Sequence, residues 1–361
     1  MKKWSVLIVI LLCLSWVSHA SAKTTLRYAN FFPPTHIQSQ LAESWCKEVE
    51  KRTHGEVVIQ YFPASTLTKA PQTYDGVVQG IADIGMTALG YSRGRFPVAE
   101  AIDLPMGYTS GVQATAVANA MYEKFKPEEF KESHILFFHA HGPGLIHTRD
   151  KEINTLEDLK GLKIRSTGTS GLVMDALGAS PVGKSMRECY QMLQKGVVDG
   201  SCHPIESNKG WKLGEVVHYM IQNFSTAYTT TFGVFMNQNK WNQLTPEQQN
   251  AITEINLEWA VKHGEAWDES DKAGMAFFKE KGGVVIPQSE EEAEKWREAA
   301  RPVLDNYIKK VSKKGVDGKA VVDFIKSNMG HKPTTSNETK DTNNAGLKWA
   351  PQKLCSLVSC L

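Results

Sequence analysis

Arg165 is the residue of this chain best suited to recognise an anion. It ends a short apolar segment within LEDLKGLKIRSTG (156–168), just before the chain turns at residues 166–168. Arginine stays charged, and its planar fork of N–H donors matches a carboxylate or a sulfonate better than lysine does. An arginine after a strand is more often a solvated surface charge. We nevertheless take Arg165 as the candidate anchor, because the rest of the chain favours an anion-binding site.

Several aromatic and polar residues could form the walls of the same site. They are Asn30, Phe31, Phe32, His36, Tyr91 and Trp211. The first four belong to the loop after the first predicted strand, and a proline-rich aromatic loop can also be only a rigid turn. For Tyr91 and Trp211 the alternative is ordinary packing. Aromatic walls would favour an aromatic or branched acid over a sugar acid.

Histidines and cysteines offer two rival chemistries. The histidines lie close together in the sequence, at His134, His139, His141 and His147. No carboxylate or cysteine at metal-ligand spacing accompanies them, so we expect structural histidines and neither a metal nor another cofactor. Cys202 and His203 are adjacent, an arrangement that rarely orients a nucleophile toward its base. Since GxSxG, HExxH and phosphate-loop motifs are also absent, the sequence predicts a binding protein rather than an enzyme.

The two ends of the chain indicate where the protein works. Residues 1–22 have a basic start, an apolar run from Val6 to Val17 and small residues before Lys23, which is typical of a secretory signal peptide. We therefore expect an exported protein, cleaved near Ala22. The polar segment after Gly330 predicts disorder over residues 331–361, with an unexplained apolar end where Cys355 and Cys360 could pair.

The charge of the chain is nearly balanced. Lysine and arginine number 41, aspartate and glutamate 39, and the formal net charge is +2. The basic residues are dispersed and form no basic helix, so we expect no nucleic-acid partner. The three cysteines at positions 46, 189 and 202 match no metal or disulfide spacing and are interpreted as small buried hydrophobic residues.

Alternating strands and helices must position the candidate residues. The first unit is predicted as strand 25–30, helix 37–52, strand 57–62, helix 74–79 and strand 81–86, a right-handed βαβαβ arrangement. The second unit is predicted as strand 135–139, short helix 155–159, strand 162–165, helix 172–177, helix 185–195 and strand 197–200. Strand 229–236, helix 246–279, strand 284–286 and helices 290–310 and 317–327 follow. Two α/β units suggest a cleft between them, and Arg165, Asn30 and the turn at 88–91 all follow strands that could face it.

The chain resembles the solute-binding proteins of TRAP transporters, the DctP family. The matching segments include GEVVIQYFPASTL (55–67), GIADIGM (80–86), DLP (103–105), LEDLKGLKIRSTG (156–168), ALGASPV (176–182), ECYQMLQKGVVDG (188–200) and MNQNKWNQLTPEQQNAI (236–252). Their shared order over the whole mature chain makes the resemblance specific. Arg165 occupies the place of the arginine that grips the ligand carboxylate in this family.

The resemblance implies a two-domain periplasmic-binding-protein-like α/β fold with a hinge, an interdomain ligand site and a long helix that spans both domains. Residues 23–148 with about 229–275 would form domain I, and residues 149–228 with about 276–330 domain II. The expected function is capture of a small organic anion and its delivery to a permease of one small and one large membrane subunit. A receptor that presents ligand to a membrane sensor and a binding protein of an ATP-driven uptake system remain the alternatives.

The chain departs from the family pattern at three places. His203 stands where many members have an asparagine after the DG turn. Leu145 stands near the position of a second arginine that some members carry. Lys184 follows ALGASPV where proline and methionine are common, so it could add a second positive charge. We therefore include His203 and Lys184 among the candidate ligand contacts.

Overall fold

The computed structural model describes residues 23–92 and 94–329. The predicted signal peptide, the predicted tail and the possible pair Cys355–Cys360 lie outside these residues.

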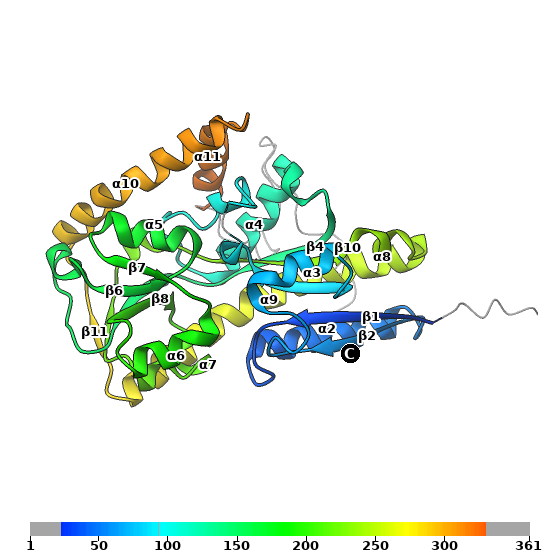
Figure 1. The fold of residues 1–361 in the computed structure, drawn as a ribbon, viewed down its shortest axis with the longest axis horizontal. Helices are drawn as coiled ribbons and strands as arrows, with labels where there is room; N and C mark the ends of the chain where they lie inside the picture. Colours follow the sequence, from blue (N-terminus) through cyan, green and yellow to red (C-terminus); the bar gives the residue numbers. More distant parts are fainter. Residues whose placement is uncertain (1–22, 93, 330–361) are drawn as a thin grey trace, which may run out of the picture.

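Sheet A organises the first lobe of the molecule (Figure 1). Its strands are β1 (Thr24–Asn30), β2 (Val57–Phe62), β3 (Ile84–Ala88), β4 (Ser133–Ala140) and β10 (Thr231–Asn237), in the order β2-β1-β3-β10-β4. β1 pairs in parallel with β2 and β3, as the predicted βαβαβ unit requires. β10 is antiparallel to β3 and β4 because it returns to this sheet from the other half of the molecule.

Three helices, α2 (Ile37–Arg52), α3 (Thr73–Val78) and α4 (Gly111–Phe125), pack against sheet A. Helix α2 has the predicted bounds and buries Trp45 and Val49 from its apolar stripe. Helix α4 was not predicted, although Ser110 caps it by accepting a hydrogen bond from the Gln113 N–H. Three of its alanines (Ala114, Ala118 and Ala120) are buried, and such a weakly amphipathic sequence carries little periodic signal.

Sheet B organises the second lobe. Its strands are β5 (Gly144–Thr148), β6 (Lys163–Ser166), β7 (Ser180–Gly183), β8 (Gly200–Pro204), β9 (Tyr219–Ile221) and β11 (Val284–Ile286), in the order β11-β9-β5-β8-β6-β7. Helices α5 (Gly168–Ala176), α6 (Met186–Gln194) and α7 (Ser207–Gly210) belong to the same lobe. Ser185 and Glu188 form a capping box at the start of α6.

Three strand predictions need correction. Strand 135–139, predicted as the start of the second unit, is β4 of sheet A in the first lobe. The predicted strand 81–86 begins three residues later as β3, and of the predicted strand and turn at 197–200 only Gly200 belongs to a strand, β8. Val197 is exposed, so the apolar pair at 197–198 does not mark a buried strand. Gly200, the first residue of β8, lies so close to β5 that a Cβ there would meet the His147 carbonyl oxygen at 2.3 Å.

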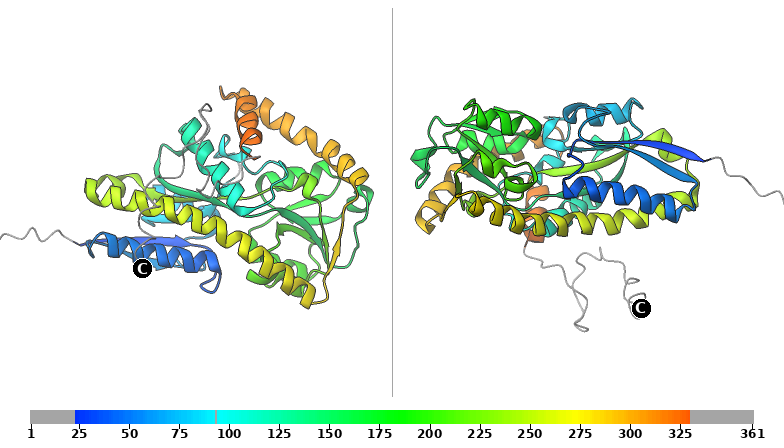
Figure 2. Two further views of the ribbon diagram at one scale, coloured as in Figure 1. Left: turned by 180° about the vertical axis from the view of Figure 1, so that it is seen from behind. Right: turned by 90° about the horizontal axis from the view of Figure 1, so that it is seen from below.

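Helix α9 (Pro246–Glu280) runs along both lobes (Figure 2). It packs against α2 and α4 of the first lobe and against α7 of the second. Thr245 and Gln248 form a capping box at its start, and Pro246 occupies the first turn, where a missing N–H costs nothing. The short helix α8 (Gln238–Asn242) precedes it. The helix therefore gives the two lobes a common rigid support.

The domain boundaries stay a prediction, but two segments pair differently from it. β5 lies within the predicted domain I, yet it pairs with β8 and β9 of sheet B. Helix α10 (Glu290–Ser312) starts near the second lobe and reaches the first, where the Tyr307 hydroxyl donates to the Val98 carbonyl. Helix α11 (Gly318–Met329) then packs against α4 of the first lobe rather than inside domain II. A 23-residue helix spans about 35 Å, which is long enough for this crossing.

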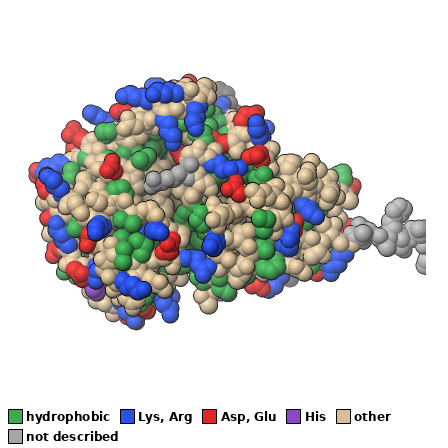
Figure 3. All heavy atoms as spheres, viewed as in Figure 1, with side chains coloured by type: hydrophobic (Ala, Val, Ile, Leu, Met, Phe, Trp, Pro, Cys, Tyr) green, Lys and Arg blue, Asp and Glu red, His purple; other side chains and the backbone are tan. Residues whose placement is uncertain are grey.

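Basic and acidic side chains are interspersed over the face shown in Figure 3. The charge on this face follows the dispersed pattern of the sequence.

Candidate functional site

A pocket lies between the two lobes. It is lined by Phe31, Phe32, Ala88, Tyr91, His141, Arg165, Thr167, Met186, Cys202, His203, Pro204, Glu206, Ser207, Trp211, Tyr228, Thr230, Phe232 and Trp267. These residues come from both sheets, from α9 and from the segments that connect the lobes. The cavity measures about 30 Å³, room for about two water molecules. A ligand that carries a ring therefore requires the walls to separate.

Arg165 lies on β6 and is 3% exposed. Its Nε–H donates to the Lys184 carbonyl at 2.8 Å, and Nη1 donates to the Cys202 carbonyl at 3.3 Å. A guanidinium has five N–H donors, so these two bonds leave three for another partner. Two neutral carbonyls do not neutralise a buried cation, and burial of a charge is costly without an opposite charge. The geometry is that of a fixed guanidinium prepared for an anion.

Aromatic rings from opposite lobes form much of the wall. Phe31 and Phe32 stack on each other with centroids 4.4 Å apart. Trp211 of the second lobe lies nearly parallel to Phe31, at a centroid distance of 6.3 Å and an interplanar angle of 20°. Phe232 and Trp267 continue the wall, stacked at 5.4 Å. Such walls supply a flat apolar surface but few hydrogen bonds, which suits the body of an apolar ligand.

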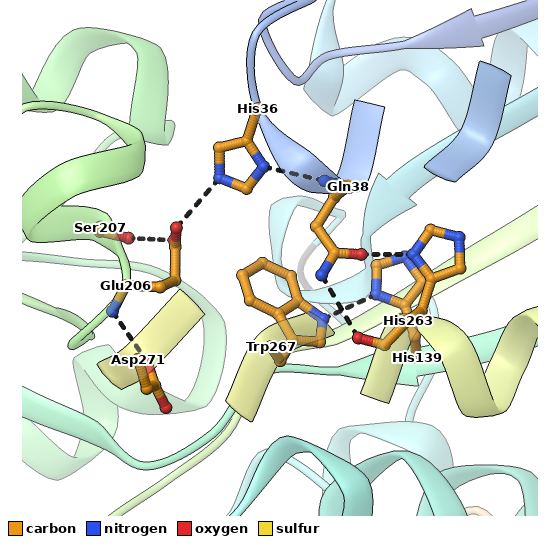
Figure 4. Close-up of polar contacts among 8 residues, drawn as sticks. All are labelled: His36, Gln38, His139, Glu206, Ser207, His263, Trp267 and Asp271. Atoms are coloured by element: carbon orange, nitrogen blue, oxygen red, sulfur yellow. Dashed lines mark hydrogen bonds and ion pairs between the residues drawn. The ribbon is translucent and has the colours of Figure 1, made fainter. Parts of the chain in front are cut away.

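A buried polar contact joins the lobes beside this wall (Figure 4). His36 of the first lobe and Glu206 of the second are 3.1 Å apart, Nε2 to Oε2, with both side chains almost fully buried. His36 Nδ1 accepts from the Gln38 N–H, so Nε2 is the ring nitrogen that donates to Glu206. The Ser207 hydroxyl donates to Glu206 Oε1 at 2.6 Å. The backbone N–H of Glu206 donates to Asp271 of α9, and burial raises the pKa of that carboxyl well above its usual range.

Backbone contacts also join the lobes close to Arg165. A Cβ at Gly168, whose φ is 51°, would lie 2.8 Å from the Gly90 Cα of the opposite lobe. The Tyr91 hydroxyl accepts a hydrogen bond from the Met186 N–H at 3.1 Å. The lobes can therefore approach this closely because Gly168 has no Cβ.

The structure brings six of the nine predicted site residues to the pocket. They are Phe31, Phe32, Tyr91, Arg165, His203 and Trp211. His36 does not line the pocket. Its ring stacks on Phe32 with centroids 4.3 Å apart and hydrogen-bonds to Glu206. Asn30 is buried under the first-lobe loop, where its Oδ1 accepts from the Phe32 N–H.

Lys184 does not line the pocket, in contrast to the expected second positive charge. Its side chain is half exposed and pairs with Glu188 at 3.3 Å, one helical turn along α6. Its backbone carbonyl, rather than its ammonium group, reaches Arg165. The ion pair with Glu188 accounts for the charge of Lys184 at the start of α6.

The sequence analysis missed several pocket residues. Phe232 and Trp267 line the pocket from β10 and α9, and Glu206 lies two residues after β8. The spacing of Trp259, His263 and Trp267 at four-residue intervals marks one face of α9 and could have indicated Trp267. No local signal distinguishes Glu206 from a surface acid.

The four clustered histidines are at least partly buried and do not converge on one point. His141 lines the pocket, and burial lowers its pKa to about 4. His139 accepts from the Trp267 indole N–H at 3.0 Å, while His134 stacks on Trp241 at 3.7 Å. Over residues 23–92 and 94–329, no group of three or more histidine, cysteine, aspartate or glutamate side chains could hold a metal ion. The three cysteines in this range are buried and free.

None of the helices described here is both long and apolar enough to cross a bilayer. The family model for DctP, bacterial extracellular solute-binding protein family 7, matches residues 28–310. The 2,3-diketo-L-gulonate-binding periplasmic protein of Escherichia coli is 26% identical over 313 residues, which cover 84% of this chain and 93% of that protein.

Three solved structures show the same fold. A TRAP periplasmic solute-binding protein from Desulfovibrio salexigens is 34% identical, with a TM-score of 0.76 over 85% of this chain and 96% of that one. A TRAP solute-binding protein from Rhodoferax ferrireducens, in complex with copurified benzoate, is 27% identical with a TM-score of 0.80 over 85% and 98%. One from Bordetella bronchiseptica, with bound (R)- and (S)-mandelate, is 27% identical with a TM-score of 0.79 over the same shares.

Proposed function

The chain belongs to the bacterial extracellular solute-binding proteins of family 7, the DctP family, and we propose that it captures a small aromatic monocarboxylate between its lobes. TRAP solute-binding proteins bind organic acids, so the broad ligand class follows from the family. The finer assignment rests mainly on one observation: a buried guanidinium with three free N–H donors adjoins an aromatic wall.

The charges of the pocket favour one carboxylate over two. Arg165 is the one lysine or arginine among the described lining residues, and Glu206 lies on the same pocket. A second carboxylate would meet no second cation and would be repelled by Glu206 at short range. The rings of Phe31 and Trp211 then favour a flat apolar body over a polyhydroxylated sugar acid, whose hydroxyls would lose water without gaining partners.

Capture requires closure of the lobes on the ligand. The carboxylate would sit on Arg165 of the second lobe while the ring contacts Phe31 and Phe232 of the first. A ligand that touches both lobes stabilises their closed arrangement by its differential affinity for that arrangement. The contacts of Gly90 with Gly168 and of His36 with Glu206 would form in the closed arrangement and separate on opening.

The partners and the location are proposed on family grounds. We infer that the mature protein works in the periplasm, after cleavage of the predicted signal peptide near Ala22, and delivers its ligand to the small and large subunits of a TRAP permease. The relatives are binding proteins, which supports a role without turnover. Family membership also favours this system over the sensor-receptor and ATP-driven alternatives.

A thermal-shift screen tests the proposal. Benzoate, mandelate and 3-hydroxyphenylacetate should raise the melting temperature, since a ligand that binds only the native state stabilises it. Succinate, glucuronate and neutral benzyl alcohol serve as matched probes for a second charge, a sugar body and a missing charge. Stabilisation by glucuronate or benzyl alcohol, without any by the aromatic acids, would contradict the assignment.

A further inference from the structure

His203 lines the pocket next to Arg165 and has one ring nitrogen without a partner. The side chain is fully buried, and its Nδ1 has no hydrogen-bond partner among the described residues. Arg165 donates to the carbonyl of Cys202, the residue directly before His203, so the guanidinium and the imidazole adjoin. Buried polar atoms are nearly always hydrogen-bonded, so an unpartnered nitrogen on a side chain that lines the pocket is available to a ligand.

The kind of contact depends on whether Nδ1 carries a proton, and a chain of hydrogen bonds determines this. His147 of β5 stacks on His203 with ring centroids 3.8 Å apart. Its Nδ1 lies 3.3 Å from the Leu145 carbonyl oxygen, which can only accept a hydrogen bond. His147 Nδ1 therefore carries the proton, and His147 Nε2 is an acceptor.

The side-chain amide of Asn208 hydrogen-bonds to both His147 and His203, so the tautomer of His147 determines that of His203. Its amide nitrogen lies 3.2 Å from His147 Nε2 and donates to it. Its amide oxygen then faces His203 Nε2 at 3.4 Å and accepts from it. If the amide were flipped, its oxygen would face the unprotonated His147 Nε2, so two acceptors would be opposed. His203 accordingly carries its proton on Nε2.

The ring of His203 is neutral, so Nδ1 is a bare acceptor. Burial, the neighbouring His147 and the Arg165 charge lower the pKa of His203 well below its usual range. Burial likewise lowers the pKa of His147, to about 3. Protonation of Nδ1 would place a second cation beside Arg165.

We propose that the bare Nδ1 of His203 selects acids that carry a hydroxyl next to the carboxylate, so that the ligand is a 2-hydroxy acid. This inference rests on the proposed function, because the carboxylate must first sit on Arg165. The hydroxyl of a 2-hydroxy acid donates to Nδ1. In a 2-oxo acid, the carbonyl oxygen at C2 would face the lone pair of Nδ1, so two acceptors would repel each other. An acid with no substituent at C2 would leave Nδ1 without a hydrogen bond.

Three phenyl acids that differ only at C2 test the proposal by calorimetry. They are mandelate (each enantiomer), phenylacetate and phenylglyoxylate, which offer a donor, nothing and an acceptor to His203. We expect the better mandelate enantiomer to bind about tenfold tighter than phenylacetate, equivalent to about 1.4 kcal/mol. We expect phenylglyoxylate to bind more weakly than phenylacetate.

The variant His203→Phe keeps a ring stacked on His147 but removes the acceptor. In this variant, mandelate affinity should fall to the level of phenylacetate affinity. Phenylacetate affinity should stay within about threefold of its wild-type value, and phenylglyoxylate should bind as tightly as phenylacetate. A long-range ¹H–¹⁵N NMR spectrum of the wild-type protein, with histidine assignment, should show Nδ1 of His203 unprotonated. It reports the tautomer even if the variant does not fold.

The failures of the two proposals are distinguishable. If none of the three acids binds the wild-type protein, the proposed function is wrong and this inference falls with it. If all three bind with no preference for mandelate, or if Nδ1 carries the proton, only the role assigned to His203 is wrong.

Discussion

Replacement of Arg165 by methionine should abolish most of the affinity for benzoate. Methionine roughly preserves the length of the side chain but removes the charge and all five N–H donors. In the wild-type protein two donors are held by the Lys184 and Cys202 carbonyls, so the fork that remains can make two bonds to one carboxylate. Each charge-assisted bond contributes about 1.5–3 kcal/mol net. Because water can partly replace the lost donors, we use the lower end and expect a loss of about 10²–10³-fold.

Titration calorimetry with benzoate measures this loss, and two further variants make it specific. Arg165→Lys keeps the charge without the fork, so we expect a smaller loss of about 10–10²-fold. Lys184→Ala removes a half-exposed lysine that pairs with Glu188, so its affinity should stay within about twofold.

The outcome that would refute the role of Arg165 is simple. If folded Arg165→Met, verified by circular dichroism, binds benzoate within threefold of the wild-type protein, the guanidinium does not hold the carboxylate. A large loss in Lys184→Ala would show instead that the second positive charge matters after all.

Three other perturbations test the contact between the lobes and the buried charges. Gly168→Ala and Gly178→Ala each replace a glycine at positive φ, so each variant should lose about 1 kcal/mol of stability in melting experiments. Only Gly168→Ala should weaken benzoate binding, because only a Cβ at position 168 meets the opposite lobe. Equal benzoate affinities of the two variants would contradict this. Burial raises the pKa of Asp103 to about 8, above its unfolded value. The stability of the wild-type protein relative to Asp103→Asn should therefore fall as pH rises from about 4 to 8. A difference in melting temperature between the two proteins that does not change with pH would contradict this prediction. A double-mutant cycle of His36→Phe and Glu206→Gln should give a coupling of about 1 kcal/mol or more in benzoate affinity, whereas additive effects would show that the pair does not act at closure.

Local patterns in the sequence were sufficient for many of the elements. Trp45 and Val49 lie on the apolar stripe of α2, which has the predicted bounds, and a capping box of Ser185 and Glu188 starts α6. These features depend on residues a few positions apart, so the chain encodes them without reference to the fold. Arg165 was proposed as the anchor in the same way, from its residue type and its place after an apolar strand.

Strand order and the origin of β8 required the tertiary structure. The apolar pair at 197–198 suggested a strand, but β8 starts at Gly200, where only glycine can lie against the β5 backbone. Likewise, the short strand β5 gave no local signal and joins sheet B through its pairing with β8 and β9. Pairing partners far apart in the sequence decide such elements.

What the sequence by itself determined is the set of chemical groups: a permanent cation after a strand, aromatic loops, and an ordered series of motifs along the chain. Only the tertiary structure decided which groups share the pocket. It turned Lys184 outward along α6, placed Glu206 against His36 170 residues away, and oriented the ring nitrogens of His203 through Asn208. The physical reason is that side-chain direction, burial and proton position depend on contacts between distant segments, whereas residue type and helical spacing are local properties of the chain.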